Sequence, residues 1–131
     1  MRTTKELLCW VKEEIALAKN ALQYYDNPNT AHIAEFSEMT NYSNELISNF
    51  EKIAIILENY NSFKNDLGEY TIQDINTMKE FCLNEKIKFT DAANENLKIK
   101  EQFYKAISNN DAASYYQDLE MLLIQLINLH S

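Results

Sequence analysis

Apolar residues along most of the chain recur at steps of three and four, the spacing of one face of an α-helix. The first such segment predicts a helix that begins after Thr3 and ends in the sequence DNPNT at 26–30. Thr3 and Glu6 have the spacing of a capping box, in which each side chain accepts a hydrogen bond from a free backbone N–H. Pro28 cannot continue a helix, so a second helix is expected just after it.

The strongest pattern lies between Phe36 and Tyr60, where the steps of three and four alternate without interruption. Such a heptad repeat predicts a helix that packs against its neighbours at shallow crossing angles. We expect this second helix to continue nearly to Gly68, because glycine can leave the last turn in a left-handed conformation.

A third helix is predicted to start after Thr71, which forms a second capping box with Asp74. Its apolar stripe is interrupted at Glu85 and Asn96, and a drifting stripe then continues through Ala93, Leu97, Tyr104 and Ile107. One long helix is the favoured interpretation, with a break near 89–93 as the alternative. The last helix is expected after the sequence SNND at 108–111, where an asparagine or aspartate can cap it.

The predicted helix lengths suggest an architecture. At 1.5 Å per residue, the second and third helices would each be about 50 Å long, and the first and last about 30 Å. Short connections make neighbouring helices antiparallel, so the two short helices would flank one half of a long central hairpin. A single glycine and a single proline in 131 residues agree with few turns. The expected fold is all-α, an antiparallel bundle of four or five helices that forms one domain over residues 1–131.

The other half of that hairpin, at 50–83, would project without covering helices although it is rich in large apolar residues. Exposed apolar surface of this size marks interaction sites on soluble proteins. The residues expected at this interface are Ile53, Ile55, Ile56, Tyr60, Phe63, Leu67, Tyr70, Met78, Phe81 and Leu83. We expect a second copy of the chain to cover them in a homodimer. The competing explanation is that the third helix breaks near Phe89 and folds back over the tip.

Charge limits the kinds of partner. The formal net charge of −8 argues against direct binding to nucleic acid or to anionic lipid. The heptad repeat places Glu38, Glu45, Glu51 and Glu58 on the solvent side of the second helix. This acidic face could imitate a phosphate backbone and occupy a nucleic-acid-binding protein, although a solvated face of an acidic protein is the simpler interpretation.

Candidate catalytic and metal-binding residues are few. His32 and Glu35 lie one turn apart, but a metal site in a bundle needs further inward-facing ligands, and His130 is the only other histidine. No sequence feature pairs Cys9 or Cys82 with a histidine, as a nucleophile would require. We therefore predict no catalytic residue, no cofactor-binding residue and no metal ligand. Both cysteines are expected to be reduced and buried.

The functional hypothesis is a non-enzymatic protein–protein interaction module. It would be a small acidic helical regulator or inhibitor of the immunity, antitoxin, phage-inhibitor or effector-regulator type, and its composition suggests an AT-rich, bacterial coding sequence. The alternatives are an export chaperone that holds an amphipathic helix, and an acidic nucleic-acid mimic. Charges near the N-terminus leave no signal-peptide core, and the apolar run at 121–129 is too short to span a bilayer. A cytoplasmic protein without membrane contact is expected, with secretion lacking a cleaved signal still open.

Overall fold

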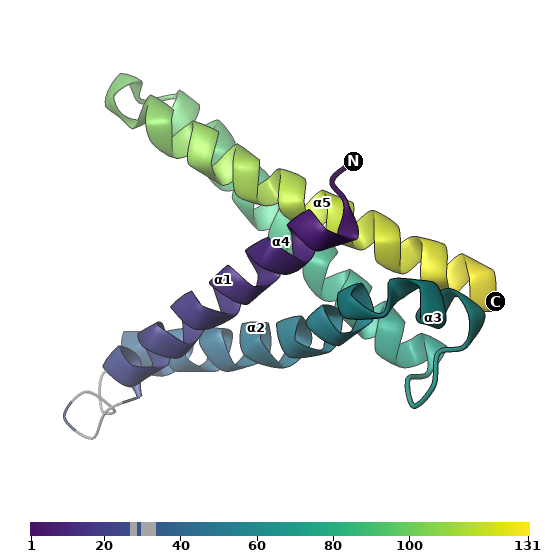
Figure 1. Cartoon of the computed structure of the whole chain (residues 1–131). Helices are drawn as coiled ribbons and strands as arrows, with labels where there is room; N and C mark the ends of the chain where they lie inside the picture. Colours follow the sequence, from purple (N-terminus) through teal and green to yellow (C-terminus); the bar gives the residue numbers. More distant parts are fainter. Residues whose placement is uncertain (27–28, 30–33) are drawn as a thin grey trace. The chain divides into compact units, whose positions relative to one another are not determined.

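The computed structural model describes residues 1–26, 29 and 34–131, and within them the chain is an all-α helical bundle, as predicted. The helices are α1 (Thr4–Tyr25), α2 (Ala34–Glu58), α3 (Tyr60–Asn65), α4 (Ile72–Leu97) and α5 (Phe103–His130), with a short 3-10 turn, η1 (Lys100–Gln102), before α5 (Figure 1). Pro28 and His32, which the sequence analysis singled out, lie outside the described residues. The helices fall into two compact units.

The first unit comprises Thr3–Tyr60, in which α1 and α2 pack side by side as an antiparallel pair. The predicted capping box starts α1, because the Glu6 amide donates to the Thr3 hydroxyl at 3.1 Å and the Thr3 amide donates to the Glu6 carboxylate at 3.4 Å. The rings of Trp10 and Phe50 meet with their centroids 5.7 Å apart. The fully buried apolar side chains of this unit are Leu7, Val11, Phe50, Ile53 and Ile56.

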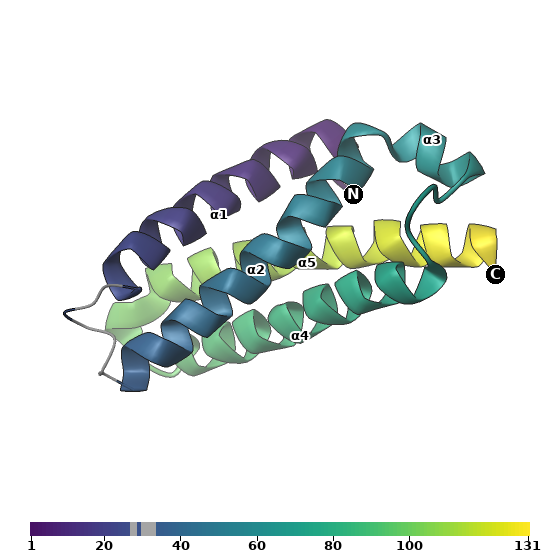
Figure 2. The same ribbon diagram turned by 90° about the horizontal axis from the view of Figure 1, so that it is seen from below.

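The second unit comprises Met1–Arg2 and Asn61–Ser131, and its framework is the antiparallel pair of α4 and α5 (Figure 2). Tyr116 lies in the centre of this pair, with its ring 5.8 Å from that of Phe89 and 6.3 Å from that of Phe81. A ring nitrogen of His130 donates to the Phe63 carbonyl at 2.7 Å, which links the end of α5 to α3. The other fully buried side chains of the pair are Ile75, Met78, Cys82, Ala93, Ala106, Leu119, Leu123 and Leu126.

The predicted start of α4 and the predicted left-handed conformation of Gly68 are confirmed. Thr71 and Asp74 form a capping box at the start of α4, with bonds of 3.1 Å and 2.8 Å between the side chains and the opposite amides. Gly68 has a φ of +61°, the left-handed conformation that an L-residue adopts only at a cost. Its amide donates to the Asp66 carboxylate at 2.8 Å, so the turn between α3 and α4 is closed locally.

The predicted end of the second helix is wrong, because α2 ends at Glu58 instead of continuing towards Gly68. The amide of Asn59 bonds to the Ile56 carbonyl, three residues back, and its side chain donates to the Ile55 carbonyl at 3.1 Å. A separate short helix, α3, then begins at Tyr60. The asparagine side chain competes with the helical backbone bonds at this point, as asparagine commonly does.

The predicted boundary between the third and fourth helices is also wrong. The favoured continuity through 89–93 is confirmed, but α4 ends at Leu97, about ten residues earlier than expected. Helix α5 begins at Phe103 and passes through the sequence SNND at 108–111 without interruption. With 26 and 28 residues, α4 and α5 are about 39 Å and about 42 Å long. Helix α5 is therefore long enough to pack along the whole length of α4.

Candidate interaction surface

The residues predicted to form an uncovered apolar tip are mostly covered by the chain itself. Of the ten, Ile55 is exposed. The buried ones are Ile53, Ile56, Tyr60, Met78 and Phe81, and the half-buried ones are Phe63, Leu67, Tyr70 and Leu83. In the α4–α5 unit the cause is the early start of α5, whose Tyr116 reaches the ring of Phe81. The homodimer through these residues stays a prediction, but the exposed apolar surface that motivated it is largely absent.

The predicted acidic face of α2 is exposed at all four positions, Glu38, Glu45, Glu51 and Glu58. However, Lys12 lies 3.2 Å from Glu58 and Lys19 lies 3.5 Å from Glu51, both reaching across from α1. Exposed pairs of this kind contribute at most about 1 kcal/mol to stability. Their main effect here is to neutralise two of the four carboxylates, so this face is a weaker imitation of a phosphate backbone than the sequence of α2 suggested.

The two cysteines differ, and neither is in a disulfide. Cys82 is buried as predicted, whereas the prediction for Cys9 is wrong, since its thiol is exposed on α1. Burial raises the pKa of the Cys82 thiol, and the charges of Glu120 and Glu85 raise it further. A thiol held in its protonated form is a poor nucleophile and a poor metal ligand.

Buried carboxylates in the α4–α5 unit each have a cation beside them. Glu120 lies 2.7 Å from the ammonium group of Lys86, and Glu85 lies 3.1 Å from that of Lys88. Within the described residues, no three His, Cys, Asp or Glu side chains are grouped as a metal ion would require. Both carboxylates are therefore paired with a lysine of α4.

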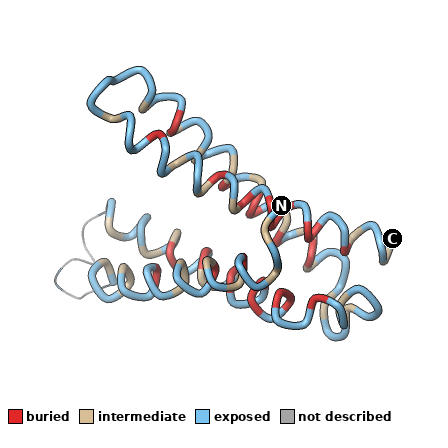
Figure 3. The backbone as a smooth tube through the Cα atoms, turned by 45° about the horizontal axis from the view of Figure 1, so that its top comes forward, coloured by how far each residue is buried: buried red, intermediate tan, exposed pale blue. Residues whose placement is uncertain are grey.

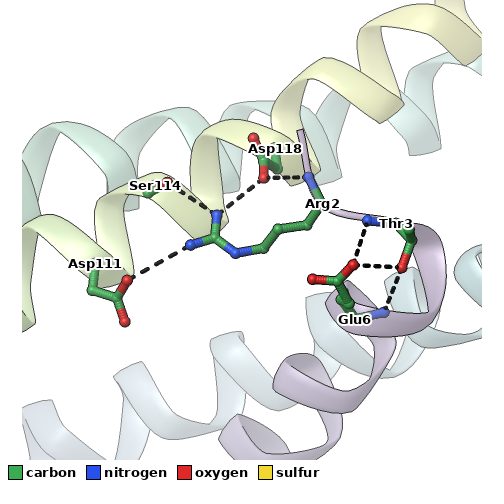
Figure 4. A network of polar contacts seen from close by, with 6 residues as sticks. All are labelled: Arg2, Thr3, Glu6, Asp111, Ser114 and Asp118. Atoms are coloured by element: carbon green, nitrogen blue, oxygen red, sulfur yellow. Dashed lines mark hydrogen bonds and ion pairs between the residues drawn. The ribbon is translucent and has the colours of Figure 1, made fainter.

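Arg2, the only arginine in the chain, anchors the N-terminal residues to α5 (Figure 4). One guanidinium nitrogen lies 3.0 Å from both the Asp118 carboxylate and the Ser114 hydroxyl. The backbone amide of Arg2 donates to the same carboxylate at 3.1 Å, and the guanidinium carbon sits 3.7 Å from the centre of the Tyr115 ring. Asp118 is thus a buried carboxylate whose charge is matched by hydrogen bonds and a cation.

The most exposed apolar cluster surrounds the turn between α4 and α5, which Figure 3 shows mainly as exposed. We call this cluster the turn patch. Its members, with the exposed fraction of each residue, are Leu97 (52%), Ile99 (47%), Phe103 (58%), Tyr104 (67%) and Ile107 (57%). Single exposed apolar residues are ordinary, but five large ones lie within eleven consecutive positions around one turn, and concentrated exposed apolar surface marks interaction sites.

The conformation of this turn is fixed by polar groups. Asn96 is at the centre, since its side-chain amide donates to Gln102 at 3.0 Å and its carbonyl oxygen accepts from Asn109 at 2.7 Å. Ile99 is extended, and its amide donates to the Asn96 backbone carbonyl at 3.1 Å. Because these bonds close the turn, the apolar side chains of the turn patch are not required to hold it together.

The charge around the turn patch is opposite in sign to that of the whole chain. Residues 97–107 contain three lysines, Lys98, Lys100 and Lys105, and one acid, Glu101, which gives a local net charge of +2 against −8 overall. Lys98 pairs with Glu95 at 2.9 Å, although both side chains are largely in solvent. Lys100 and Lys105 form no ion pair with any described residue.

A shallow depression of about 270 Å³ lies on α5 and shares a residue with the turn patch. It is lined by Tyr104, Lys105, Ser108 and Asn109. Tyr104 and Ser108 contribute hydroxyls, the Asn109 amide is bonded to Asn96, and Lys105 contributes a positive charge that has no acid beside it in the lining. The depression therefore suits a group that accepts hydrogen bonds, above all an anionic one.

Sequence reasoning missed the turn patch because it assigned Leu97, Tyr104 and Ile107 to the buried stripe of an unbroken helix. A usable signal was present, since Asn96 interrupts that stripe, and it is the residue that organises the turn. No helix in the described part of the chain is long and apolar enough to cross a membrane. In comparisons with known proteins, the chain matches no family model and shows no significant similarity to a curated protein or a solved structure.

Proposed function

We propose that this protein is a non-enzymatic module that regulates or blocks a protein partner, which it binds through the turn patch. The observation that supports this most strongly is the group of five large apolar side chains, each about half exposed or more, at the closed end of the α4–α5 pair. Complete burial of such a side chain stabilises by about 1.5–3 kcal/mol, so burial of the exposed parts could contribute about 4–8 kcal/mol together.

That energy is comparable with the lower end of the cost of association, about 4–15 kcal/mol. A partner must therefore add apolar surface of its own, as partners do in stable complexes. The turn patch lies on a hairpin end whose backbone is already fixed by the bonds of Asn96, so little conformational freedom is lost on binding. A regulator that acts by covering a surface of its partner needs exposed apolar side chains and a fixed backbone, and it needs no catalytic group.

The alternative of a nucleic-acid mimic receives less support. Lys12 and Lys19 neutralise Glu58 and Glu51, which leaves Glu38 and Glu45 as the carboxylates of the α2 face without an ion pair among the described residues. Two carboxylates one heptad apart are too sparse to imitate a phosphate backbone, in which a charge recurs about every 1.7 Å along the duplex.

The test is affinity capture after cross-linking in the cells that produce the protein. We expect Ile107→Glu to lose a partner that the natural protein retains, because a charge in the turn patch cannot be buried without a counter-ion. The matched control is Leu17→Glu on α1, since the two residues are exposed to similar extents, 57% and 61%. Circular dichroism should show unchanged helicity for both variants. A captured set that is the same for both variants and the natural protein would overturn the proposal.

A further inference from the structure

We infer that the surface recognised by the turn patch is an acidic, amphipathic segment of a protein, with carboxylates placed around an apolar face. This inference rests on the proposed function and specifies its partner. It depends on two observations: the sign of the charge around the patch and the side chains that line the neighbouring depression.

The lysines give the turn patch its electrostatic character. Lys98, Lys100 and Lys105 lie among its apolar residues, and Glu101 is the one acid between Leu97 and Ile107. Lys100 and Lys105 have no ion-pair partner in the part of the chain that is described, so their charges remain available. Complementary charge at the rim of an apolar contact accelerates association and selects among partners. An acidic rim on the partner is the arrangement that these lysines favour.

The depression on α5 adds a position for one carboxylate. Lys105 and Ser108 present an ammonium and a hydroxyl one turn apart, and the phenol of Tyr104 adds a further donor, while the amide of Asn109 is already bonded to Asn96. The lysine and the two hydroxyls would donate to a carboxylate oxygen, and charge-assisted bonds of this kind are the stronger ones. A basic side chain would be opposed by Lys105 at the same place.

Other occupants fit these observations less well. A second copy of the chain, docked patch to patch, would bring two surfaces of net charge +2 together. An anionic bilayer would also attract the lysines, but it presents no side chain to enter the depression. An acidic segment satisfies the apolar residues, the lysines and the depression together.

The experiment uses the full chain and two synthetic amphipathic helical peptides of about 20 residues. Both have the same leucine and phenylalanine face, while the polar face of one is glutamate and that of the other is lysine. We expect the acidic peptide to bind at least about tenfold more tightly by fluorescence anisotropy, and its affinity to fall between about 50 mM and about 500 mM salt.

Two pairs of variants separate the contributions. Lys100→Glu with Lys105→Glu should reduce the affinity for the acidic peptide at least about tenfold. The control, Lys5→Glu with Lys52→Glu, changes the net charge equally at two exposed lysines of the other unit and should leave the affinity unchanged. Ile107→Ser should weaken binding of the acidic peptide, whereas Leu17→Ser should not.

Several results would overturn the inference. Equal affinity for the two peptides would rule out a preference for an acidic partner. An equal loss of affinity in the two lysine double variants would rule it out as well. Light scattering that detects a dimer split by Ile107→Ser would identify a second copy as the occupant. Vesicles of phosphatidylcholine and phosphatidylglycerol at about 3:1 that bind the natural protein, and not Ile107→Ser, would identify lipid. The peptide results do not test the proposed function itself. That proposal fails if Ile107→Glu captures the same cellular proteins as Leu17→Glu and the natural protein.

Discussion

The buried thiol of Cys82 should make the protein less stable at alkaline pH. Burial, with the nearby charges of Glu120 and Glu85, raises the pKa of this thiol in the folded chain. In the unfolded chain the thiol returns to its ordinary pKa of about 8.5. Above that pH the unfolded state binds fewer protons than the folded state, so the free energy of unfolding decreases as pH rises.

The magnitude follows from the unfolded thiol alone, provided that the folded thiol stays protonated. At pH 9.5 the unfolded thiol is about ten-elevenths ionised, which lowers the free energy of unfolding by about 1.4 kcal/mol, whereas at pH 7.5 the same effect is below about 0.1 kcal/mol. Burial also raises the pKa of Tyr60 and Tyr70, and the charges of Glu69 and Asp74 raise that of Tyr70 further. Their contribution begins mainly above pH 10, outside this window.

Urea unfolding followed by circular dichroism at several pH values between 7.5 and 9.5 measures the effect. We expect Cys82→Ala to be less stable at pH 7.5, because it leaves a small cavity, but to lose about 1.4 kcal/mol less than the natural protein on going to pH 9.5. Cys9→Ser is the control, since it removes an exposed thiol and leaves the buried Cys82 in place, and its pH profile should run parallel to that of the natural protein. Parallel pH profiles for Cys82→Ala and the natural protein would refute the reasoning.

The same features give three further predictions. In the folded protein a thiol-reactive dye should label Cys9 rapidly and Cys82 only after denaturation; equal labelling rates would contradict the burial of Cys82. Arg2→Ala should lower the free energy of unfolding by about 1–3 kcal/mol, because Asp118 loses its cation, and Arg2→Lys should restore only part of it; an unchanged urea midpoint for the alanine variant would argue against this anchor. Gly68→Ala should cost about 1–2 kcal/mol, since φ is +61° and an added Cβ would meet no atom within 4 Å, so the cost is conformational; a neutral result would mean that the turn relaxes.

Local sequence signals predicted the starts of α1 and α4 and the conformation of Gly68. The capping boxes at Thr3 and Thr71 and the left-handed Gly68 depend on residues close together in sequence, and all three are present. The all-α class likewise followed from the periodic apolar positions. Each of these signals involves residues within one turn of each other, so it can be recognised without knowing the tertiary contacts.

The turn between α4 and α5 could not be located in the same way. The sequence SNND at 108–111 has good capping residues, yet it lies inside α5, while the true turn at 98–102 contains neither glycine nor proline. Its geometry comes from the bonds that Asn96 makes with Gln102 and Asn109, thirteen residues away in the second case. Because the turn was misplaced, the length of α5 was underestimated, and an uncovered tip was predicted at the wrong end of α4.

The separation of roles at the α4–α5 turn has an evolutionary consequence. The amides of Asn96, Gln102 and Asn109 fix the backbone, while the apolar side chains of the turn patch lie outside that network. Under the proposed function, substitutions in the patch would alter recognition and leave this network intact, whereas substitutions among the amides would remove bonds of the turn. In a lineage that diverges under pressure from a changing partner, the three amides should persist while the patch residues exchange rapidly. Such a hairpin end would allow binding specificity to change while the backbone of the turn stays the same.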